Sequence, residues 1–264
     1  MITVPHDPES TTDDLLTHFD ARAATYTTGA SWVTDPVALA PIVSWFENHS
    51  PKSAVEFGVG TGAVPASLSG NRLLPDRYYG IDISPEMLRH ATGWTPVNAD
   101  ASHTSVASDS IDVVVARQVF HYFENPMAAL DEARRILRHD GTIIVSHIVP
   151  FDDGEDENWW TRAVELRQPL RRQMVTHAAL CRWLDDAGFG IVDTVEVSRR
   201  SSLQSWLRRY PVTAEAKTAL STHYRRMHST VARIREPRNT PDGDITFNIR
   251  WMTVVARPCG PPSR

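Results

Sequence analysis

The sequence predicts an α/β fold built on a doubly wound, seven-stranded, mostly parallel sheet. Three observations support this prediction. Apolar stretches typical of strands alternate with helical stretches over residues 54–149. Two of the helical stretches begin with a good N-cap followed directly by proline, at Ser84 and Asn125. A glycine turn at residues 58–62 joins the first strand to the helix that follows it.

Two helices are expected before the first strand. In residues 12–24 the apolar side chains, Leu15 and Phe19 among them, fall on one helical face. A second helix is expected over residues 36–48. Together these helices form an expected N-terminal cover over residues 1–50.

The core of the sheet is expected within residues 51–149. Strands that alternate with helices make parallel βαβ units, so helices should cover both faces of this sheet. The expected strands are residues 54–57, 78–82, 95–98, 111–116 and 141–149, and the expected helices begin near Ala63, at Ser84, and at Asn125, the last running to Arg138.

Residues 150–264 are expected to complete the sheet and to add helical lid insertions, within one structural domain overall. The last strand is expected to run antiparallel. After a Trp-rich stretch at 156–174, the expected elements are a helix at 176–188, a strand at 191–198, helices at 202–210 and 213–235, and a final strand at 244–258.

Composition excludes several classes of protein. The 264 residues are 41% hydrophobic and 22% charged, as in an ordinary globular protein. The net charge of −5 gives no broad basic field for nucleic acid. The two cysteines, Cys181 and Cys259, make neither a disulfide framework nor a metal site, and no apolar stretch approaches membrane-spanning length. We therefore expect a cytoplasmic protein without metal, membrane or nucleic-acid partners.

The glycine turn fits two kinds of ligand. Residues 58–63 read G-x-G-x-x-A, the dinucleotide fingerprint, and Asp82 follows at the spacing that this motif requires. Glu56, however, lies two residues before the first glycine, where a carboxylate would repel a diphosphate. The same carboxylate suits a cationic ligand.

Four stretches in order carry a family resemblance: EFGVGTG, GIDISPEML, NADA and ARQVFHYFENPMAALDEARRILRHDG. This series closely resembles the class I S-adenosylmethionine-dependent methyltransferases, in particular the ubiquinone/menaquinone-biosynthesis branch (methyltransferase type 11), which includes many small-molecule enzymes of secondary metabolism. The resemblance runs from about His18 to Gly188. It implies a Rossmann-like sheet, S-adenosyl-L-methionine as cofactor, and methyl transfer to a small organic molecule.

The resemblance also implies roles for individual residues. Glu56 and the backbone of Gly58 and Gly60 should face the methionine part of the cofactor, and Asp82 should accept hydrogen bonds from the ribose hydroxyls. The other implied contacts are Ile83, Met87 and Asp100 beside the adenine, Ala101 through its backbone, Arg117 through its backbone to the methionine ammonium, and Tyr26, which closes the pocket from the N-terminal side.

The candidates for a general base are two histidines at carboxyl ends of strands, His121 and His147. Either could instead be packed beside the cofactor or satisfied by backbone. Four tryptophans near the expected lid could enclose an aromatic or apolar substrate, or merely pack the lid: Trp159, Trp160, Trp206 and Trp251. Arginines at 162, 167, 171, 172, 199, 200, 208 and 209 raise the further possibility of an anionic substrate.

Three alternative functions stay open. A nicotinamide-dependent oxidoreductase would use the glycine turn for a dinucleotide. An RNA methyltransferase would use the arginine clusters. A methyltransferase-like protein could use the fixed charge of the cofactor to catalyse cyclisation or rearrangement. The acceptor atom (oxygen, nitrogen or carbon) and the oligomeric state stay undetermined.

Overall fold

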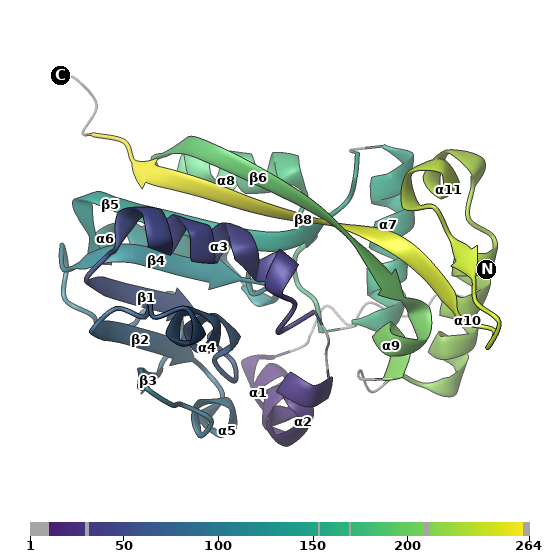
Figure 1. The fold of residues 1–264 in the computed structure, drawn as a ribbon, viewed down its shortest axis with the longest axis horizontal. Coiled ribbons are helices and arrows are strands. Elements are labelled where there is room, and N and C mark those ends of the chain that lie inside the picture. The colour runs from purple at the N-terminus through teal and green to yellow at the C-terminus, as the bar shows by residue number, and fades with distance from the viewer. Residues whose placement is uncertain (1–10, 30–31, 153, 169, 209–211, 261–264) are drawn as a thin grey trace.

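The computed structural model describes residues 11–29, 32–152, 154–168, 170–208 and 212–260. Its centre is a mixed sheet with the path β3-β2-β1-β4-β5-β8-β6 (Figure 1). The strands are β1 (Ser53–Phe57), β2 (Arg77–Asp82), β3 (Thr95–Asn98), β4 (Ile111–Arg117), β5 (Leu137–Val149), β6 (Phe189–Ser202), β7 (Arg238–Asn239) and β8 (Ile245–Pro258).

The strand directions confirm the predicted Rossmann-like sheet. Strands β1 to β5 pair in parallel, and β8 runs antiparallel to both of its neighbours, β5 and β6. The sequence did not reveal the short strand β7, which pairs with β8 at one end.

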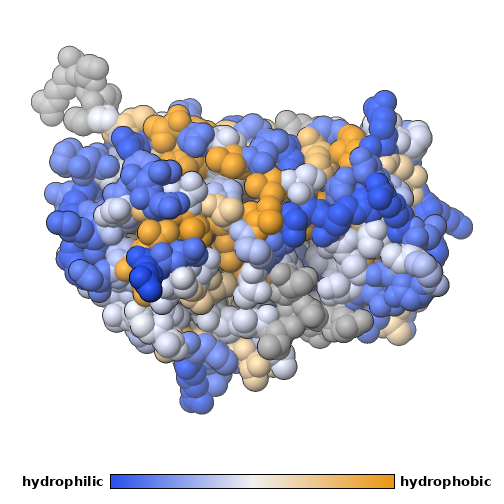
Figure 2. All heavy atoms as spheres, viewed as in Figure 1, coloured by the Kyte–Doolittle hydropathy of each residue, from blue (hydrophilic) through white to orange (hydrophobic). Residues whose placement is uncertain are grey.

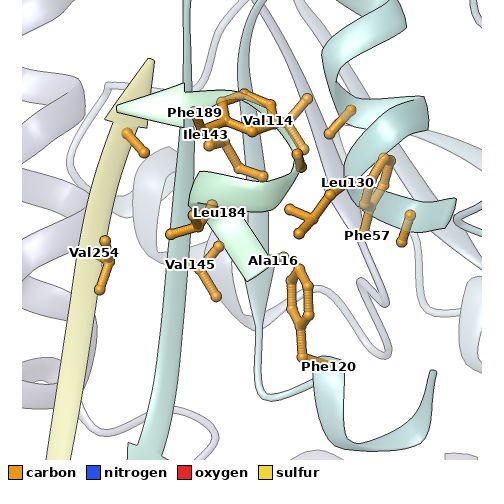
Figure 3. Close-up of a cluster of buried hydrophobic side chains, with 14 of the residues drawn as sticks. Phe57, Val114, Ala116, Phe120, Leu130, Ile143, Val145, Leu184, Phe189 and Val254 are labelled. Carbon is orange, nitrogen blue, oxygen red and sulfur yellow. The ribbon is translucent and has the colours of Figure 1, made fainter. Parts of the chain in front are cut away.

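Helices cover both faces of the sheet. The helix α3 (Pro36–His49) and α4 (Ala63–Gly70) pack on one face, where Phe46 and Leu68 meet Val113 and Ile144. The other face carries α6 (Pro126–Ile136) and α8 (His177–Asp186), and Figure 3 shows the buried side chains between these helices and the strands. Burial of this kind is the main source of stability in such a sheet.

The remaining helices lie around the strand ends. One group, in which the first two helices both contact the third, consists of α1 (Thr12–Asp20), α2 (Ala23–Gly29) and α5 (Pro85–Leu88). Around the far halves of β6 and β8 are α7 (Glu155–Arg167), α9 (Leu203–Arg208), α10 (Ala214–Arg225) and α11 (Ser229–Arg235), as Figure 1 shows.

Helix starts agree with the cap residues in the sequence. Ser84 Oγ accepts from the Met87 N–H at 3.1 Å, and Asn125 Oδ1 accepts from the Met127 N–H at 3.1 Å. In each case the next residue is proline, whose missing donor costs nothing at that position.

Two helices expected as single elements are each divided into two. The helix expected over 12–24 stops at Asp20, where the Asp20 carboxylate accepts from Ser84 Oγ at 2.5 Å. The helix expected over 213–235 stops at Arg225 and restarts at Ser229, with His228 as the new N-cap. The apolar spacing stays in phase across this second break, so periodicity alone does not show it.

The helix expected to end at Arg138 ends at Ile136, and β5 starts four residues before its expected start at Gly141. At Gly141 an added Cβ would lie 2.9 Å from the Arg138 carbonyl oxygen, so the chain turns too closely there for a side chain. The irregular start of β5 coincides with a register shift between Ile111 and Val113 in β4.

Exposed apolar side chains gather on one face of the molecule. Figure 2 shows hydrophobic residues over α3 and the middle of β6, with hydrophilic residues around them. The most exposed of these is Val192, at 56%. Within the described ranges, no helix combines the length and the apolar character that a membrane span requires.

Candidate active site

A cavity of about 330 Å³ lies at the carboxyl ends of β1, β2 and β4, and we call it the strand-end cavity. This is the edge at which open α/β sheets bind ligands. The cavity size falls within the range of small-molecule sites. All ten residues that the resemblance assigned to the cofactor line it: Tyr26, Glu56, Gly58, Gly60, Asp82, Ile83, Met87, Asp100, Ala101 and Arg117.

The glycine turn has a backbone that side chains rarely adopt. Gly58 and Gly60 have φ angles of 64° and 55°. A Cβ on Gly58 would lie 2.4 Å from Val119 Cγ2, whereas a Cβ on Gly60 would meet nothing nearer than Tyr26 Cε1 at 3.9 Å. The first glycine is therefore required by packing, and the second borders open space in the cavity.

The third glycine of the turn serves packing. Gly62 is absent from the residues that line the strand-end cavity, and an added Cβ would lie 3.0 Å from the ring of Trp94. Gly80 in β2 is covered by the same ring, with only 2.3 Å between an added Cβ and Trp94. The two glycines make room for one indole between the turn and β2.

Asp82 links the glycine turn to the next strand end. Its Oδ2 accepts from the Gly60 N–H at 2.8 Å, and its Oδ1 accepts from the Ser84 N–H at 2.9 Å. Burial raises the pKa of this carboxyl, and the backbone N–H groups of Ser84, Gly60 and Ile83 oppose that rise. A carboxylate offers about four lone-pair sites, so the three backbone donors leave room for a hydroxyl donor in the cavity.

Asp100 caps its own loop and also lines the strand-end cavity. Its Oδ1 accepts from the Ser102 N–H at 2.8 Å and from Ser102 Oγ at 2.6 Å. The loop-cap interpretation and the ligand interpretation of this residue are therefore compatible.

Glu56 is a buried acid at the end of β1. Tyr78 donates its hydroxyl proton to Glu56 Oε2 at 2.6 Å. Burial raises the pKa of Glu56 to about 8, although the Tyr78 hydrogen bond and the charge of Arg117 both favour the ionised form. A cation in the cavity would stabilise the carboxylate further.

The Arg117 side chain binds the backbone just before α3. Its guanidinium donates to the carbonyl oxygens of Trp32 at 2.8 Å and Val33 at 3.1 Å. It also lies 4.7 Å from the ring centre of Trp251 and 5.6 Å from that of Trp32. Burial lowers the pKa of Arg117 to about 10. The sequence had suggested a role only for the Arg117 backbone.

The two candidate histidines form a hydrogen-bonded pair. His147 Nδ1 lies 2.8 Å from the carbonyl oxygen of Ile148, which can only accept, so Nδ1 carries the proton. His147 Nε2 is then a lone pair, and it lies 2.8 Å from His121 Nδ1, which must donate. This assignment of tautomers leaves His121 Nε2 as a proton acceptor.

Burial keeps both rings neutral. It lowers the pKa of His147 to about 3 and that of His121 well below its usual value, with a further contribution from the charge of Arg171. His121 lines a small cavity of about 40 Å³, which we call the connecting cavity, whereas His147 lies behind it. Of the two histidines, only His121 can reach a ligand directly.

The four candidate tryptophans occupy different places. Trp160 and Trp206 line the connecting cavity with their rings stacked at 5.1 Å. Trp206 and Trp251 line a third cavity of about 240 Å³, which we call the arginine cavity. Trp159 lines none of these three cavities and stacks on His223 at 4.8 Å instead. Its position therefore favours packing of the helices over contact with a ligand in these cavities.

Two residues that the sequence did not single out lie where cavities meet. Gln118 lines the strand-end and connecting cavities, and its Nε2 is buried with no hydrogen-bond partner among the described residues. Its φ of 55° is unusual for a residue with a side chain. Trp32 lines all three cavities. The one available signal for Gln118 was its position directly after a strand end.

The charges of the strand-end cavity suit a cationic nucleoside. Glu56, Asp82 and Asp100 line it. The other charged lining residues are Arg117, whose guanidinium is directed to backbone carbonyls, and Arg172 and Glu124, which pair with each other at 3.5 Å. A diphosphate beside these acids would cost several kcal/mol by Coulomb reasoning. In the part of the chain that the structure describes, no cluster of His, Cys, Asp or Glu could hold a metal ion.

Fold and cavity together define an α/β domain that binds a nucleoside cofactor at its strand ends. Residues 55–145 match the family described as methyltransferase domain. This part of the chain is a class I S-adenosylmethionine-dependent methyltransferase domain, as the ordered motifs had implied.

Relatives and solved structures agree with this assignment. Malonyl-[acyl-carrier protein] O-methyltransferase of Hahella chejuensis is 29% identical over 150 residues, which are 54% of this chain and 52% of that protein. The YcgJ protein of Bacillus subtilis superposes with a TM-score of 0.73 at 15% identity, covering 85% of this chain and 99% of that one.

A second similar structure contains the cofactor product. Geranyl diphosphate C-methyltransferase of Streptomyces coelicolor, in complex with S-adenosyl-L-homocysteine, superposes with a TM-score of 0.54 at 12% identity. It covers 83% of this chain and 77% of its own. At such identities these structures establish the fold. The chain spans about half the length of the curated relatives that it matches.

Proposed function

We propose that the whole protein transfers a methyl group from S-adenosylmethionine to a small organic molecule whose acceptor atom carries a proton. The observation that carries this proposal is the strand-end cavity, in which buried acids from separate strand ends meet at a glycine turn. Glu56 would face the cofactor ammonium, and Asp82 would accept from a ribose hydroxyl.

When bound, the cofactor supplies a methyl carbon on a positively charged sulfur, which leaves as a neutral thioether with the electron pair of the broken bond. The protein orients the acceptor and excludes water. Gln118 lines both the strand-end cavity and the connecting cavity, and His121 lines the connecting cavity. An acceptor would approach the methyl carbon from this side. As the acceptor forms its bond to carbon, its proton passes to His121 Nε2.

His147 is proposed as a positioning residue, because its hydrogen bond fixes which nitrogen of His121 accepts. Burial lowers the pKa of His121, so that nitrogen is unprotonated at neutral pH and can accept a proton. Secondary metabolism as the context and the cytoplasm as the location belong to this proposal as well.

The test begins with calorimetry against S-adenosylmethionine, S-adenosylhomocysteine and NAD. We expect both sulfur nucleosides to bind and NAD not to bind. A mass-shift screen of small-molecule extracts should then reveal products heavier by one methylene, together with release of S-adenosylhomocysteine. If the cofactor binds and a substrate is converted without release of S-adenosylhomocysteine, the result would favour cyclisation or rearrangement instead. Binding of NAD would refute the proposal.

The histidine roles have a separate test. His121→Asn should lower turnover while leaving S-adenosylhomocysteine affinity unchanged, by the roughly 10²- to 10⁴-fold that general bases contribute. His147→Gln should lower turnover less and alter its pH profile, because the neighbouring ring would lose its fixed tautomer. If both variants keep wild-type turnover, the histidine pair is structural.

A further inference from the structure

The arginine cavity carries an excess of positive charge. Four arginines line it, and Asp35 is the single carboxylate among its described lining residues. Among the described lining residues, four guanidinium groups and one carboxylate therefore surround a cavity of about 240 Å³. Guanidinium groups are more weakly hydrated than ammonium groups and bind carboxylates and phosphates in bidentate fashion.

The one carboxylate is already occupied. Asp35 Oδ2 accepts from Arg199 Nε at 2.9 Å, and Oδ1 caps α3 by accepting from the Val37 N–H at 2.9 Å. Arg200 is directed to neighbouring oxygens, including the Glu236 carbonyl at 2.8 Å. Arg167 is 6% exposed and stacks on Trp206 at 4.4 Å. A buried guanidinium held against an indole is an orientation that suits a planar anion.

The arginine cavity adjoins the methyl-transfer site through shared residues. Arg22, Trp32, Arg167 and Trp206 line both the arginine cavity and the connecting cavity. The connecting cavity in turn shares its boundary with the strand-end cavity, through Tyr26, Trp32, Gln118 and Tyr122. One ligand can therefore extend from the methyl carbon to the arginines.

The space between the two ends is aromatic. Trp160 and Trp206 stack at 5.1 Å, and Trp32 lies 6.0 Å from Trp251. Indole faces of this kind favour the flat, apolar body of a ligand. His121 lies on the same passage, so a ligand that fills it places a proton-bearing acceptor beside Nε2.

We propose that the substrate is an amphipathic anion, with a carboxylate or phosphate bound in the arginine cavity and an aromatic or apolar body between the tryptophans. This inference rests on the proposed methyl transfer, because it assigns the substrate class of that same site. Arg22, Arg167 and Arg199 form the anion-binding end.

The experiment uses the full chain saturated with S-adenosylhomocysteine. Calorimetry compares three carboxylic acids, (4-hydroxyphenyl)acetic, 3-(4-hydroxyphenyl)propanoic and 4-(4-hydroxyphenyl)butanoic acid, each with its primary amide. It also compares 4-hydroxyphenyl phosphate with hydroquinone. At least one anion should bind about tenfold or more tightly than its neutral partner, as expected when a charge-assisted hydrogen bond is lost. The chain length and the kind of anion that bind best then define the substrate more closely.

Variants locate the anion. Arg199→Gln should abolish the preference for the anion, and Arg22→Gln, on a different element, provides the same test if the first variant does not fold. Arg233→Gln removes the same charge from an exposed position outside the three cavities and should leave the preference unchanged. If no anion binds more tightly than its partner, or if all three variants behave alike, this inference is wrong.

The first step of the experiment separates the two proposals. Failure of S-adenosylhomocysteine to bind would overturn the proposed function itself. Binding of S-adenosylhomocysteine without any preference for anions would overturn only the substrate class.

Discussion

Glu56 is the residue at which burial and charge oppose each other most directly. It is 3% exposed at the end of β1, and burial raises its pKa to about 8. The Tyr78 hydroxyl and Arg117 oppose that rise without cancelling it. The acid is therefore largely neutral at pH 7, until a positively charged ligand makes the ionised form favourable.

We predict that cofactor binding is coupled to proton release at Glu56. Because a carboxyl with a pKa of about 8 must lose its proton to meet the ligand cation, affinity should rise by up to about tenfold per unit between pH 6 and pH 8. Calorimetry at pH 7 in buffers of different ionisation enthalpy should count roughly 0.9 proton released. Glu56→Gln should bind more weakly and release none, whereas proton release equal to wild type would assign the effect to another group.

The same residue predicts how the ligand-free protein responds to pH. The folded-state pKa of about 8 lies above the reference value of 4.5, so the contribution of Glu56 to stability is complete below pH 4.5 and is lost as pH rises through 8. Chemical denaturation should show that Glu56→Gln matches wild type near pH 4.5 and is relatively more stable at pH 9. An unchanged difference between the two proteins across that range would contradict the raised pKa.

At the scale of elements, the sequence predicted which residues meet at the strand ends more accurately than it predicted where the helices end. Carboxyl ends of parallel strands meet at one edge, so Glu56, Asp82 and Asp100 could be grouped from their order alone. The packing of Trp94 over two glycines and the tautomers fixed by the Ile148 carbonyl could not be predicted in this way. Those contacts join segments whose relative placement depends on the folded sheet.

Helix breaks escaped prediction for a related reason. The division at Asp20 accompanies a hydrogen bond to Ser84, 64 positions along the chain. N-cap signals such as Asn125 act within three residues, and so they could be read from the sequence. Local signals therefore predicted helix starts, and tertiary contacts decided where some helices stopped.

The packing of β2 against Trp94 gives a prediction at this scale. Gly80→Ala would place a Cβ 2.3 Å from the Trp94 ring and 2.9 Å from Val59 Cγ1, so it should destabilise the fold by about 1–3 kcal/mol. Denaturant unfolding measures this loss, and adding Trp94→Leu should recover part of it. Gly70→Ala, where an added Cβ meets nothing within 4 Å, should be neutral or slightly stabilising. Equal unfolding midpoints for the two single variants would refute the packing argument.

Considered as a whole, the molecule has a sheet core that includes α3, so α1 and α2 are the part of the expected N-terminal cover that lies outside this core. Two of the three apolar clusters in the described ranges lie between the sheet and α3, α4, α6 and α8, and the third lies around α7, α9, α10 and the far half of β8. The described contacts of α1 and α2 with the rest include Thr27 Oγ1 to Thr61 Oγ1 at 2.7 Å and Phe19 to Tyr122 at 5.0 Å. Leu15 and Ala23 are the buried apolar residues of these two helices, and the helices lie against α5. Thr12, Leu15, Phe19 and Tyr26 of α1 and α2 line the strand-end cavity.

We therefore predict that S-adenosylhomocysteine orders residues 12–29 selectively. Tyr26 and Phe19 line the strand-end cavity, so a bound nucleoside would add contacts to these two helices, and their local opening should become rarer. Hydrogen exchange followed by mass spectrometry should show strong slowing in 12–29 and little change in β4 and β5, whose side chains are largely buried already. Glu56→Gln at the same ligand concentration serves as the control, since weaker binding should reduce the protection. Uniform slowing throughout the chain at saturation would mean that the ligand stabilises the fold globally, and unchanged exchange in 12–29 would place the ligand away from the cover.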